Sequence, residues 1–198
     1  MTVYICVTLS LPKGLESLNP RTLGPCIFVV ALEPFSQNVL RLTMITLYEP
    51  LGLAEGHKLL EIGLGSGYSA VVACETVTEN GLVVCIEIDP VVFEEGKRYV
   101  EQSGYGNVIL VQGDGGSGYP DMAPYDRICI TAACTEVPSP LFEQLKVDGK
   151  LIAPVLMDGK QSIILFEKKD TGIEEKVIDD VLLNISYVPM RGEYGTKN

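Results

Sequence analysis

One stretch of twelve residues constrains the fold of this chain more than any other. Residues 58–69 read KLLEIGLGSGYS and join a short apolar run to three glycines on alternate positions. The apolar run is typical of a buried parallel strand, and residues 69–75 favour a helix with one apolar side. A glycine turn between strand and helix lets a ligand lie against bare backbone and face free helix N–H groups. The stretch therefore predicts the first half of a doubly wound nucleotide-binding unit.

The spacing of the glycines narrows the class of nucleotide. The dinucleotide signature is G-x-G-x-x-G, whose third glycine lets the helix pack close to the strand. Here the spacing is G-x-G-x-G, and an acid, Glu61, stands near the end of the preceding strand. With that acid, the stretch resembles motif I of the S-adenosylmethionine-dependent methyltransferases. A glycine-rich turn that holds no ligand is the alternative.

The rest of the chain alternates apolar runs with helical patterns, separated by turn residues. Further strands are predicted at 82–86, 107–112, 125–131, 150–155, 161–168 and 176–187, with turns at 147–149 and 169–172. Helices are predicted at 36–48, 90–102 and 139–145. This order, βαβαβ-loop-βαβββ, predicts an α/β fold. We expect a doubly wound, mostly parallel sheet with helices on both faces and an antiparallel edge strand.

An acid ends the second predicted strand. Glu87 lies about 20 residues past the glycine turn, where a carboxylate can accept hydrogen bonds from both ribose hydroxyls of a nucleoside. Asp89 competes for this role, but Pro90 follows it and favours Asp89 as the cap of the next helix. We therefore predict Glu87 as the ribose ligand.

A second acid, Asp114, stands between Gly113 and Gly115 after the third predicted strand. It could bond an adenine amino group, or it could belong to a plain turn. Residues 61–67, Glu87, Asp114 and residues 131–133 all fall at the carboxyl ends of predicted parallel strands. Doubly wound sheets bind ligands at that edge, so these residues predict one site.

Composition excludes several classes of function. Acids outnumber bases 26 to 15, for a net charge of −11, and such a chain repels nucleic-acid phosphates. Six cysteines without C-x-x-C pairs and a single histidine predict no metal site. Reduced thiols suit a cytoplasmic protein. The apolar start is neither a convincing signal peptide nor long enough to span a membrane, so no membrane partner is expected.

Several short runs in the second half of the chain point to one family. They are GDG at 113–115, GYP at 118–120, APYDRI at 123–128, TAA at 131–133, EVP at 136–138 and LFEQLKVDGKLIAPV at 141–155. These runs resemble the middle of the protein-L-isoaspartate O-methyltransferases, and YVPMRG at 187–192 is similar to the family's closing segment. The resemblance implies a single domain, with a divergent N-terminal segment over 1–35 and the methyltransferase domain over 36–198.

The resemblance also implies the cofactor, the substrate and most of the site. The cofactor would be S-adenosylmethionine, and the methyl acceptor a protein or peptide with a free carboxylate, typically isoaspartate in a damaged protein. The alternatives are a methyltransferase with a different substrate and a cofactor-binding module without repair activity. The substrate would contact Ala132 and Ala133. The implied cofactor residues are Glu61, Gly63, Leu64, Gly65, Ser66, Gly67, Glu87, Ile88, Gly113, Asp114, Gly115 and Thr131.

The candidate catalytic residue rests on a partial match. In the family, a Thr-Ile-Ser-(Ala/Gln)-Pro segment lies over the substrate. This chain has PFSQN at 34–38, so Ser36 matches while the threonine and the proline do not. The Ser36 hydroxyl would hold one oxygen of the attacking carboxylate; a helix N-cap is the alternative role.

The chemistry needs few special side chains. A carboxylate is already ionised at neutral pH, so it can attack a methyl group without a general base. The enzyme's task is then to position and desolvate the reactants. A methyltransferase acting on adenine or amide nitrogen usually has Asn/Asp-Pro-Pro-aromatic after the fourth strand. Residues 131–134 read TAAC instead, which argues against that chemistry.

Overall fold

The computed structural model describes residues 47–178 and 187–195. Of the helix predicted over 36–48, only its end falls in this range, and residues 47–51 are helical. Ser36 lies outside the described residues. The division of the chain into residues 1–35 and 36–198 stays a prediction for the same reason.

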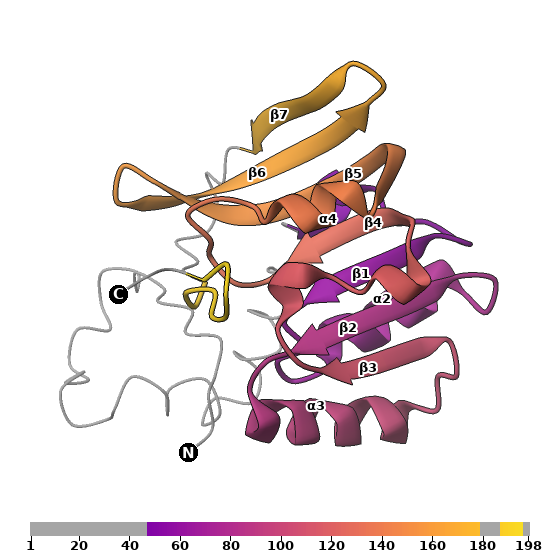
Figure 1. Cartoon of the computed structure of the whole chain (residues 1–198). Helices are drawn as coiled ribbons and strands as arrows, with labels where there is room; N and C mark the ends of the chain where they lie inside the picture. Colours follow the sequence, from indigo (N-terminus) through magenta and orange to yellow (C-terminus); the bar gives the residue numbers. More distant parts are fainter. Residues whose placement is uncertain (1–46, 179–186, 196–198) are drawn as a thin grey trace, which may run out of the picture.

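The core of the molecule is a sheet of seven strands in the order β3-β2-β1-β4-β5-β6-β7 (Figure 1). The first five strands of this order are parallel, whereas β6 pairs antiparallel with β5, and β7 with β6. The predicted fold class is confirmed, with two antiparallel pairings at one edge. The strands are β1 Lys58–Ile62, β2 Leu82–Glu87, β3 Val108–Gln112, β4 Tyr125–Ile130, β5 Leu145–Met157, β6 Lys160–Lys169 and β7 Gly172–Ile178.

Helices cover both faces of this sheet. On one face, α2 (Tyr68–Val77) and α3 (Pro90–Ser103) bury residues such as Ala73 and Val100 against Leu59 and Val83. On the other face, α4 (Ser139–Glu143) buries Leu141. Two short 3-10 helices, Gly115–Ser117 and Pro120–Met122, fill the connection between β3 and β4. No helix in the described ranges is long and apolar enough to span a membrane.

Strand β1 is the centre of the sheet, and four of its five residues are buried because both faces are covered. Successive side chains alternate between the faces. Leu59 belongs to the core beneath α2, and Leu60 belongs to the core beneath α4. Parallel pairing with β2 and β4 places the end of β1 between the ends of its neighbours. The glycine turn after β1 therefore lies in the middle of the sheet's carboxyl edge.

The first turn of α3 confirms a local prediction. Asp89 is the N-cap, and its Oδ1 accepts hydrogen bonds from the backbone N–H groups of Val91 (2.9 Å) and Val92 (3.2 Å). Pro90 follows at the first helical position, where its missing N–H has no cost.

Two predicted boundaries near the antiparallel edge are wrong. The turn predicted at 147–149 lies inside β5, which begins at Leu145; Asp148 adopts φ +59°, and the register against β4 shifts between Tyr125 and Arg127. The extra residues form an irregularity within one strand instead of a break between elements. Strand β7 begins at Gly172 instead of 176, because β6 continues to Lys169 and pairs with it there.

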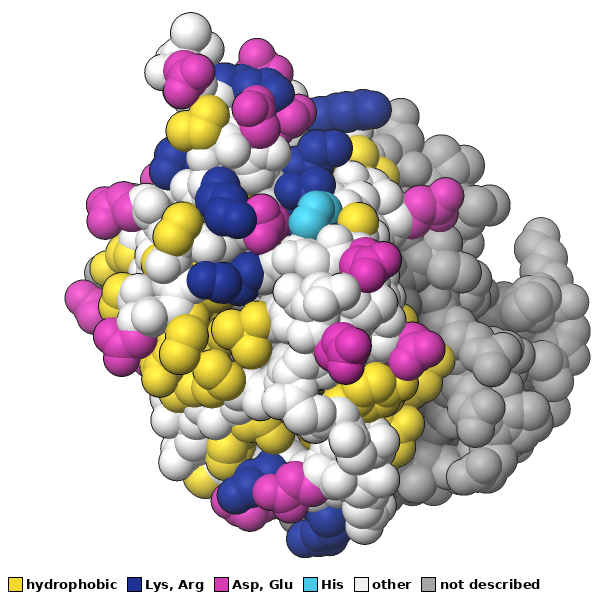
Figure 2. Space-filling model, turned by 90° about the vertical axis from the view of Figure 1, so that its right-hand side faces the viewer, with side chains coloured by type: hydrophobic (Ala, Val, Ile, Leu, Met, Phe, Trp, Pro, Cys, Tyr) yellow, Lys and Arg dark blue, Asp and Glu magenta, His cyan; other side chains and the backbone are white. Residues whose placement is uncertain are grey.

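The face at the amino ends of the parallel strands carries mixed charge. Figure 2 shows acidic and basic side chains side by side around the chain's single histidine, His57. Asp126 pairs there with Lys146 at 2.6 Å and accepts a hydrogen bond from the backbone N–H of Lys58 at 2.9 Å. Because the signs alternate, this face presents no single-sign field.

Helix α3 approaches the glycine turn so closely that two of its contacts leave no room for a side chain. A Cβ on Gly96 of α3 would lie 2.6 Å from the carbonyl oxygen of Gly65. A Cβ on Gly67 would lie 2.6 Å from the carbonyl oxygen of Gly96. These backbone contacts fix the turn against α3, so they help to set the shape of the sheet's carboxyl edge.

We predict that Gly96→Ala lowers the free energy of unfolding by about 1–3 kcal/mol, because the methyl group forces α3 away from the turn. The matched control is Gly106→Ala, since nothing lies within 4 Å of a Cβ there. Urea unfolding of the two variants measures the difference. Equal stabilities would show that the close approach of α3 does not constrain the turn.

Candidate functional site

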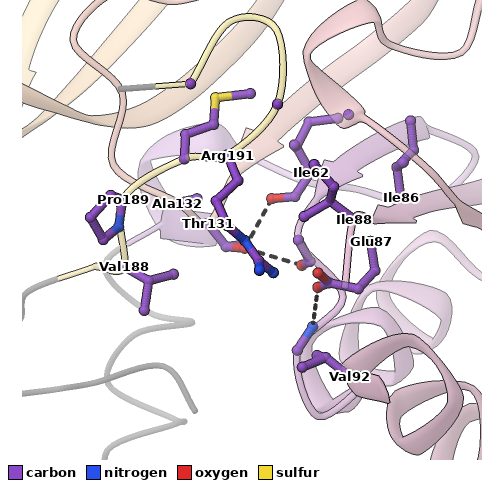
Figure 3. Close-up of a pocket in the computed structure, with 16 residues that line it drawn as sticks. Ile62, Ile86, Glu87, Ile88, Val92, Thr131, Ala132, Val188, Pro189 and Arg191 are labelled. Atoms are coloured by element: carbon purple, nitrogen blue, oxygen red, sulfur yellow. Dashed lines mark hydrogen bonds between the residues drawn. The ribbon is translucent and has the colours of Figure 1, made fainter. Parts of the chain in front are cut away.

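A cavity of about 490 Å³ lies at the carboxyl edge of the sheet, above the ends of β1, β2 and β4 (Figure 3). Its volume is within the usual range for small-molecule pockets. Most of its lining is glycine or aliphatic. The lining residues are Ile62, Gly63, Gly65, Ile86, Glu87, Ile88, Val92, Gly115, Thr131, Ala132, Val188, Pro189, Met190, Arg191, Gly192 and Gly195.

The glycine turn forms the floor of the cavity. Gly63, Gly65 and Gly67 have φ values of +101°, +54° and +81°, which favour glycine. Gly63 also packs against Thr131: a Cβ there would lie 2.2 Å from the Thr131 Oγ1. The Thr131 hydroxyl lies 2.9 Å from the carbonyl oxygen of Ile62 and 3.0 Å from that of Gly63, to which it can donate. The turn is thus joined to the end of β4.

Glu87 joins the turn to the end of β2. Its side chain is largely buried, and its Oε2 accepts hydrogen bonds from the backbone N–H groups of Leu64 (3.1 Å) and Gly65 (3.3 Å). Its Oε1 accepts from the backbone N–H of Asp89 at 3.0 Å. A carboxylate offers about four acceptor positions, so these three bonds leave one for a ligand.

The connection after β3 contributes Gly115 to the cavity, whereas Asp114 is directed to the backbone. The Asp114 Oδ1 accepts from the N–H of Gly116 at 2.9 Å, and its Oδ2 accepts from the N–H of Glu193 at 2.7 Å. Asp114 is therefore both the cap of a 3-10 turn and an anchor for residues near the C-terminal end of the chain.

The remaining wall is a segment distant in sequence, residues 187–195, which we call the C-terminal segment. It is bonded to Ala133 at the end of β4: the N–H of Ala133 donates to the carbonyl of Val188, and the N–H of Met190 to the carbonyl of Ala133, both at 2.7 Å. Together with the bond from Glu193 to Asp114, these contacts carry the segment across the sheet's edge from β4 to β3.

Glu61 points away from this cavity. It is fully buried beneath α2, where its Oε1 accepts from the Tyr48 hydroxyl at 3.0 Å and its Oε2 from the Cys85 thiol at 3.2 Å. Burial raises the pKa of Glu61 to about 7. It also raises the pKa of Cys85 well above its usual value, with the nearby Glu61 carboxyl adding to the effect.

The structure gathers about half of the predicted site residues around the cavity. Those that line it are Gly63, Gly65, Glu87, Ile88, Gly115, Thr131 and Ala132. Those that lie beside it or in the core without lining it are Glu61, Leu64, Ser66, Gly67, Gly113, Asp114 and Ala133. The roles assigned to these residues stay predictions. No cluster of His, Cys, Asp or Glu suited to a metal ion occurs in the ranges 47–178 and 187–195.

Reasoning from sequence missed Ile86, Val92 and the role of the C-terminal segment as a wall. The only signal for that segment was the resemblance of residues 187–192 to a family's closing segment, because nothing local in the sequence shows which part of the fold it contacts.

Comparison with known proteins decides the family. A model of the protein-L-isoaspartate(D-aspartate) O-methyltransferases matches residues 33–195, most of the chain. The chain belongs to this family. The family predicted from the runs in the second half of the sequence is therefore confirmed, and the cavity residues fall within the matched range.

Individual relatives agree with this assignment. A protein-L-isoaspartate O-methyltransferase of Archaeoglobus fulgidus is 43% identical over 150 residues, which cover 76% of this chain and 67% of the relative. A solved protein-L-isoaspartate O-methyltransferase has a TM-score of 0.70 at 38% identity, over 81% of this chain but 49% of its own. This chain thus spans about two thirds of the first relative's length and about half of the second's.

A third protein shows the same fold at lower identity. It is described as a putative protein-L-isoaspartate O-methyltransferase from Plasmodium falciparum in complex with S-adenosyl-L-homocysteine. Its TM-score is 0.62 at 20% identity, over 77% of this chain and 71% of its own. At 20% identity, this similarity shows only that the two chains share a fold.

Glu61 gives the methyltransferase fold of this chain a pH dependence that can be measured. The carboxyl has an ordinary pKa of 4.5 and a folded pKa of about 7. Between these values the unfolded chain ionises while the folded chain stays protonated, so rising pH lowers the free energy of unfolding. Below about pH 4.5 the carboxyl is protonated in both states, so no stability is lost. Above about pH 7 the loss is complete.

We predict that Glu61→Gln removes this loss, since glutamine is neutral and can still accept from Tyr48. Relative to the original chain, the variant should gain on the order of 3 kcal/mol in stability between pH 4.5 and pH 8. Urea unfolding across that range measures the gain, with the exposed Glu95→Gln as control. Parallel pH profiles for the original chain and Glu61→Gln would contradict the prediction.

Proposed function

We propose that this chain is an S-adenosylmethionine-dependent carboxyl O-methyltransferase that methylates isoaspartyl residues of proteins or peptides. The observation that carries the proposal is the meeting of the glycine turn, Glu87, Gly115 and Thr131 around one cavity at the carboxyl edge of the sheet. Membership of the protein-L-isoaspartate(D-aspartate) O-methyltransferase family supports the reaction type and the substrate class.

The cavity residues fit the cofactor. Gly63 and Gly65 give the floor no side chains, so an amino-acid moiety can approach the backbone there. Glu87 has an acceptor position left for a ribose hydroxyl. Ile88 and Val92 offer apolar surface beside it for a base, with Gly115 of the 3-10 helix that follows β3. In this arrangement Asp114 shapes the turn that carries Gly115 and would approach the adenine end.

When bound, S-adenosylmethionine supplies a methyl group on a positively charged sulfur. The carboxylate of isoaspartate is ionised at neutral pH and needs no general base. Among the lining residues in the described ranges, Glu87 is the one carboxylate. Its hydrogen bonds to the glycine turn suit it to binding the cofactor, not to acting as a base. The chain's contribution is therefore to align the two reactants and to exclude water with an aliphatic lining.

Thr131 and Ala132 would shape the part of the cavity where the carboxylate enters. Thr131 keeps its hydroxyl directed to the end of β1, so its methyl side and Ala132 present a small apolar surface. The bonds of Ala133 to the C-terminal segment hold that surface in place. Ser36, by the family match, would hold one oxygen of the attacking carboxylate and leave the other free to attack.

The decisive experiment is methyl transfer from labelled S-adenosylmethionine to an isoaspartyl peptide. We predict base-labile methyl incorporation, because the product is an ester, and none into the matching aspartyl peptide.

Ser36→Ala should lower this rate of methyl transfer well beyond its effect on stability, with cofactor affinity unchanged. If Ser36 is only a helix cap, Ser36→Ala instead lowers stability by about 0.5–2 kcal/mol and leaves turnover of the folded protein intact.

Two other outcomes separate the alternatives. Cofactor binding without methylation of the isoaspartyl peptide would overturn the proposed substrate and favour another acceptor or a binding module. A chain that binds neither S-adenosylmethionine nor S-adenosylhomocysteine would overturn the proposal as a whole.

We predict that Glu87→Gln weakens S-adenosylhomocysteine binding by about fivefold or more. The amide removes the negative charge that holds the ribose hydroxyl and turns one acceptor into a donor, a loss of about 1–3 kcal/mol. Calorimetric titration measures it, with Glu94→Gln on the exposed side of α3 as the matched control. A folded Glu87→Gln variant with unchanged affinity would end the assignment of Glu87 to the cofactor.

A further inference from the structure

Arg191 is the one cationic side chain that lines the cavity within the described ranges. It belongs to the C-terminal segment, and its side chain is 52% exposed. Figure 3 shows it extending from that segment toward the strand ends that carry Thr131 and Glu87. An exposed arginine usually points into solvent, so this direction calls for a physical reason.

The first reason is that the backbone on both sides of Arg191 is fixed. Met190 donates its N–H to the carbonyl of Ala133 at 2.7 Å, and Glu193 donates its N–H to Asp114 at 2.7 Å. Between them, Gly192 has no room for a side chain, since a Cβ would lie 2.3 Å from the Asp114 carboxylate. These contacts fix the backbone on both sides of Arg191, which itself lines the cavity.

The second reason is an ion pair with Asp89, the N-cap of α3. The Arg191 Nη2 lies 3.2 Å from the Asp89 Oδ2. The other oxygen of Asp89 caps α3, so the carboxylate serves the helix and the arginine at once. The N–H of Val92, then that of Val91 and the Arg191 guanidinium, hold the pKa of Asp89 below its usual value. Asp89 is thus a permanent anion at neutral pH.

The position of Asp89 decides which part of the cavity the guanidinium faces. Asp89 comes two residues after Glu87, the proposed ribose ligand, and directly after Ile88, which lines the cavity. The ion pair therefore holds the guanidinium beside the end of β2, which is the nucleoside end of the proposed site. In the part of the chain that the structure describes, only Asp89 bonds to Arg191, which leaves most of its N–H donors and its flat face for a ligand.

The nucleoside end of the cavity has no aromatic side chain to pack on a base. Adenine presents a flat ring face, and no Phe, Tyr or Trp is among the cavity-lining residues of the described ranges. The guanidinium is planar and packs well on aromatic rings. Ile88 and Val92 supply apolar surface nearby.

We propose that Arg191 is a cofactor-binding residue whose guanidinium, held by Asp89, packs against the adenine ring of the bound nucleoside. The inference rests on the proposed function for the identity of the ligand. It adds a specific contact from the C-terminal segment, so this segment would recognise the cofactor as well as cover it.

The test is the affinity of the full chain for two ligands, measured by calorimetry. S-adenosylhomocysteine carries the nucleoside and the amino acid, whereas 5′-methylthioadenosine carries the nucleoside without the amino acid. Three variants are compared: Arg191→Ala, Arg191→Lys, which keeps the charge but loses the plane, and Arg98→Ala. Arg98 is the matched control, an exposed arginine of α3 that does not line the cavity.

We expect Arg191→Ala and Arg191→Lys to weaken both ligands by a similar factor, between about threefold and about thirtyfold. Arg98→Ala should bind both as the original chain does. Asp89→Asn, which still caps the helix, should weaken both ligands less than Arg191→Ala, because it loosens the guanidinium without removing it.

Two results would overturn the proposal. Weaker binding of S-adenosylhomocysteine alone would place Arg191 on the amino-acid carboxylate. Unchanged affinity for both ligands in Arg191→Ala would reduce Arg191 to a surface ion pair that fastens the C-terminal segment. These results are distinct from a failure of the proposed function: absent methylation with intact nucleoside binding concerns the acceptor alone, and an original chain that binds neither ligand would overturn both.

Discussion

The site depends on one carboxylate that accepts backbone hydrogen bonds. Glu87, at the end of β2, holds the N–H groups of Leu64 and Gly65 with one oxygen and that of Asp89 with the other. Bonds of this kind to an ionised acceptor are stronger than neutral ones. They fix the glycine turn relative to the start of α3, and the contact of Gly96 with the turn reinforces the same arrangement. Glycines in the left-handed region have wide conformational freedom, and these bonds add to those of Thr131 in keeping the turn in one conformation.

Two acids that follow the strands, Asp89 and Asp114, help to hold the C-terminal segment. Asp89 and Asp114 each use one oxygen for a local cap and the other for the C-terminal segment. A single carboxylate can do both because its two oxygens accept in different directions. The cavity wall formed by residues 188–195 is thereby fastened to the ends of β2, β3 and β4. The same two carboxylates thus cap local turns and hold the C-terminal segment in place.

Glu61 illustrates how a motif residue can differ from its expected place. Strand residues alternate between faces, so the position that follows Leu60 points beneath α2 and into the core. There it stands in register with Cys85 and Cys129, whose thiols are buried as well. Tyr48 and Cys85 satisfy its oxygens, which lowers the cost of burying the carboxyl in its neutral form. It supports the strand beneath the glycine turn from inside the core.

Much of the fold was determined by signals local in the sequence. Short apolar runs, the alternate glycines after β1 and the Asp89-Pro90 cap fixed the order of elements and their parallel core, because each depends only on neighbouring residues. The same signals predicted that Gly65, Glu87, Gly115 and Thr131 would share one edge, since parallel strands end together. They failed at Asp148, where pairing with β4 overrode a turn signal.

Tertiary structure decided what local signals cannot carry. The direction of Glu61 depends on which face of β1 α2 covers, and the second oxygen of Asp114 depends on a partner 79 residues away. The cavity wall at Arg191 likewise depends on an ion pair across 102 residues. Contacts over such separations arise only when the whole sheet has formed, so the spacing of residues determined where the site lies, and packing determined which side chains face it.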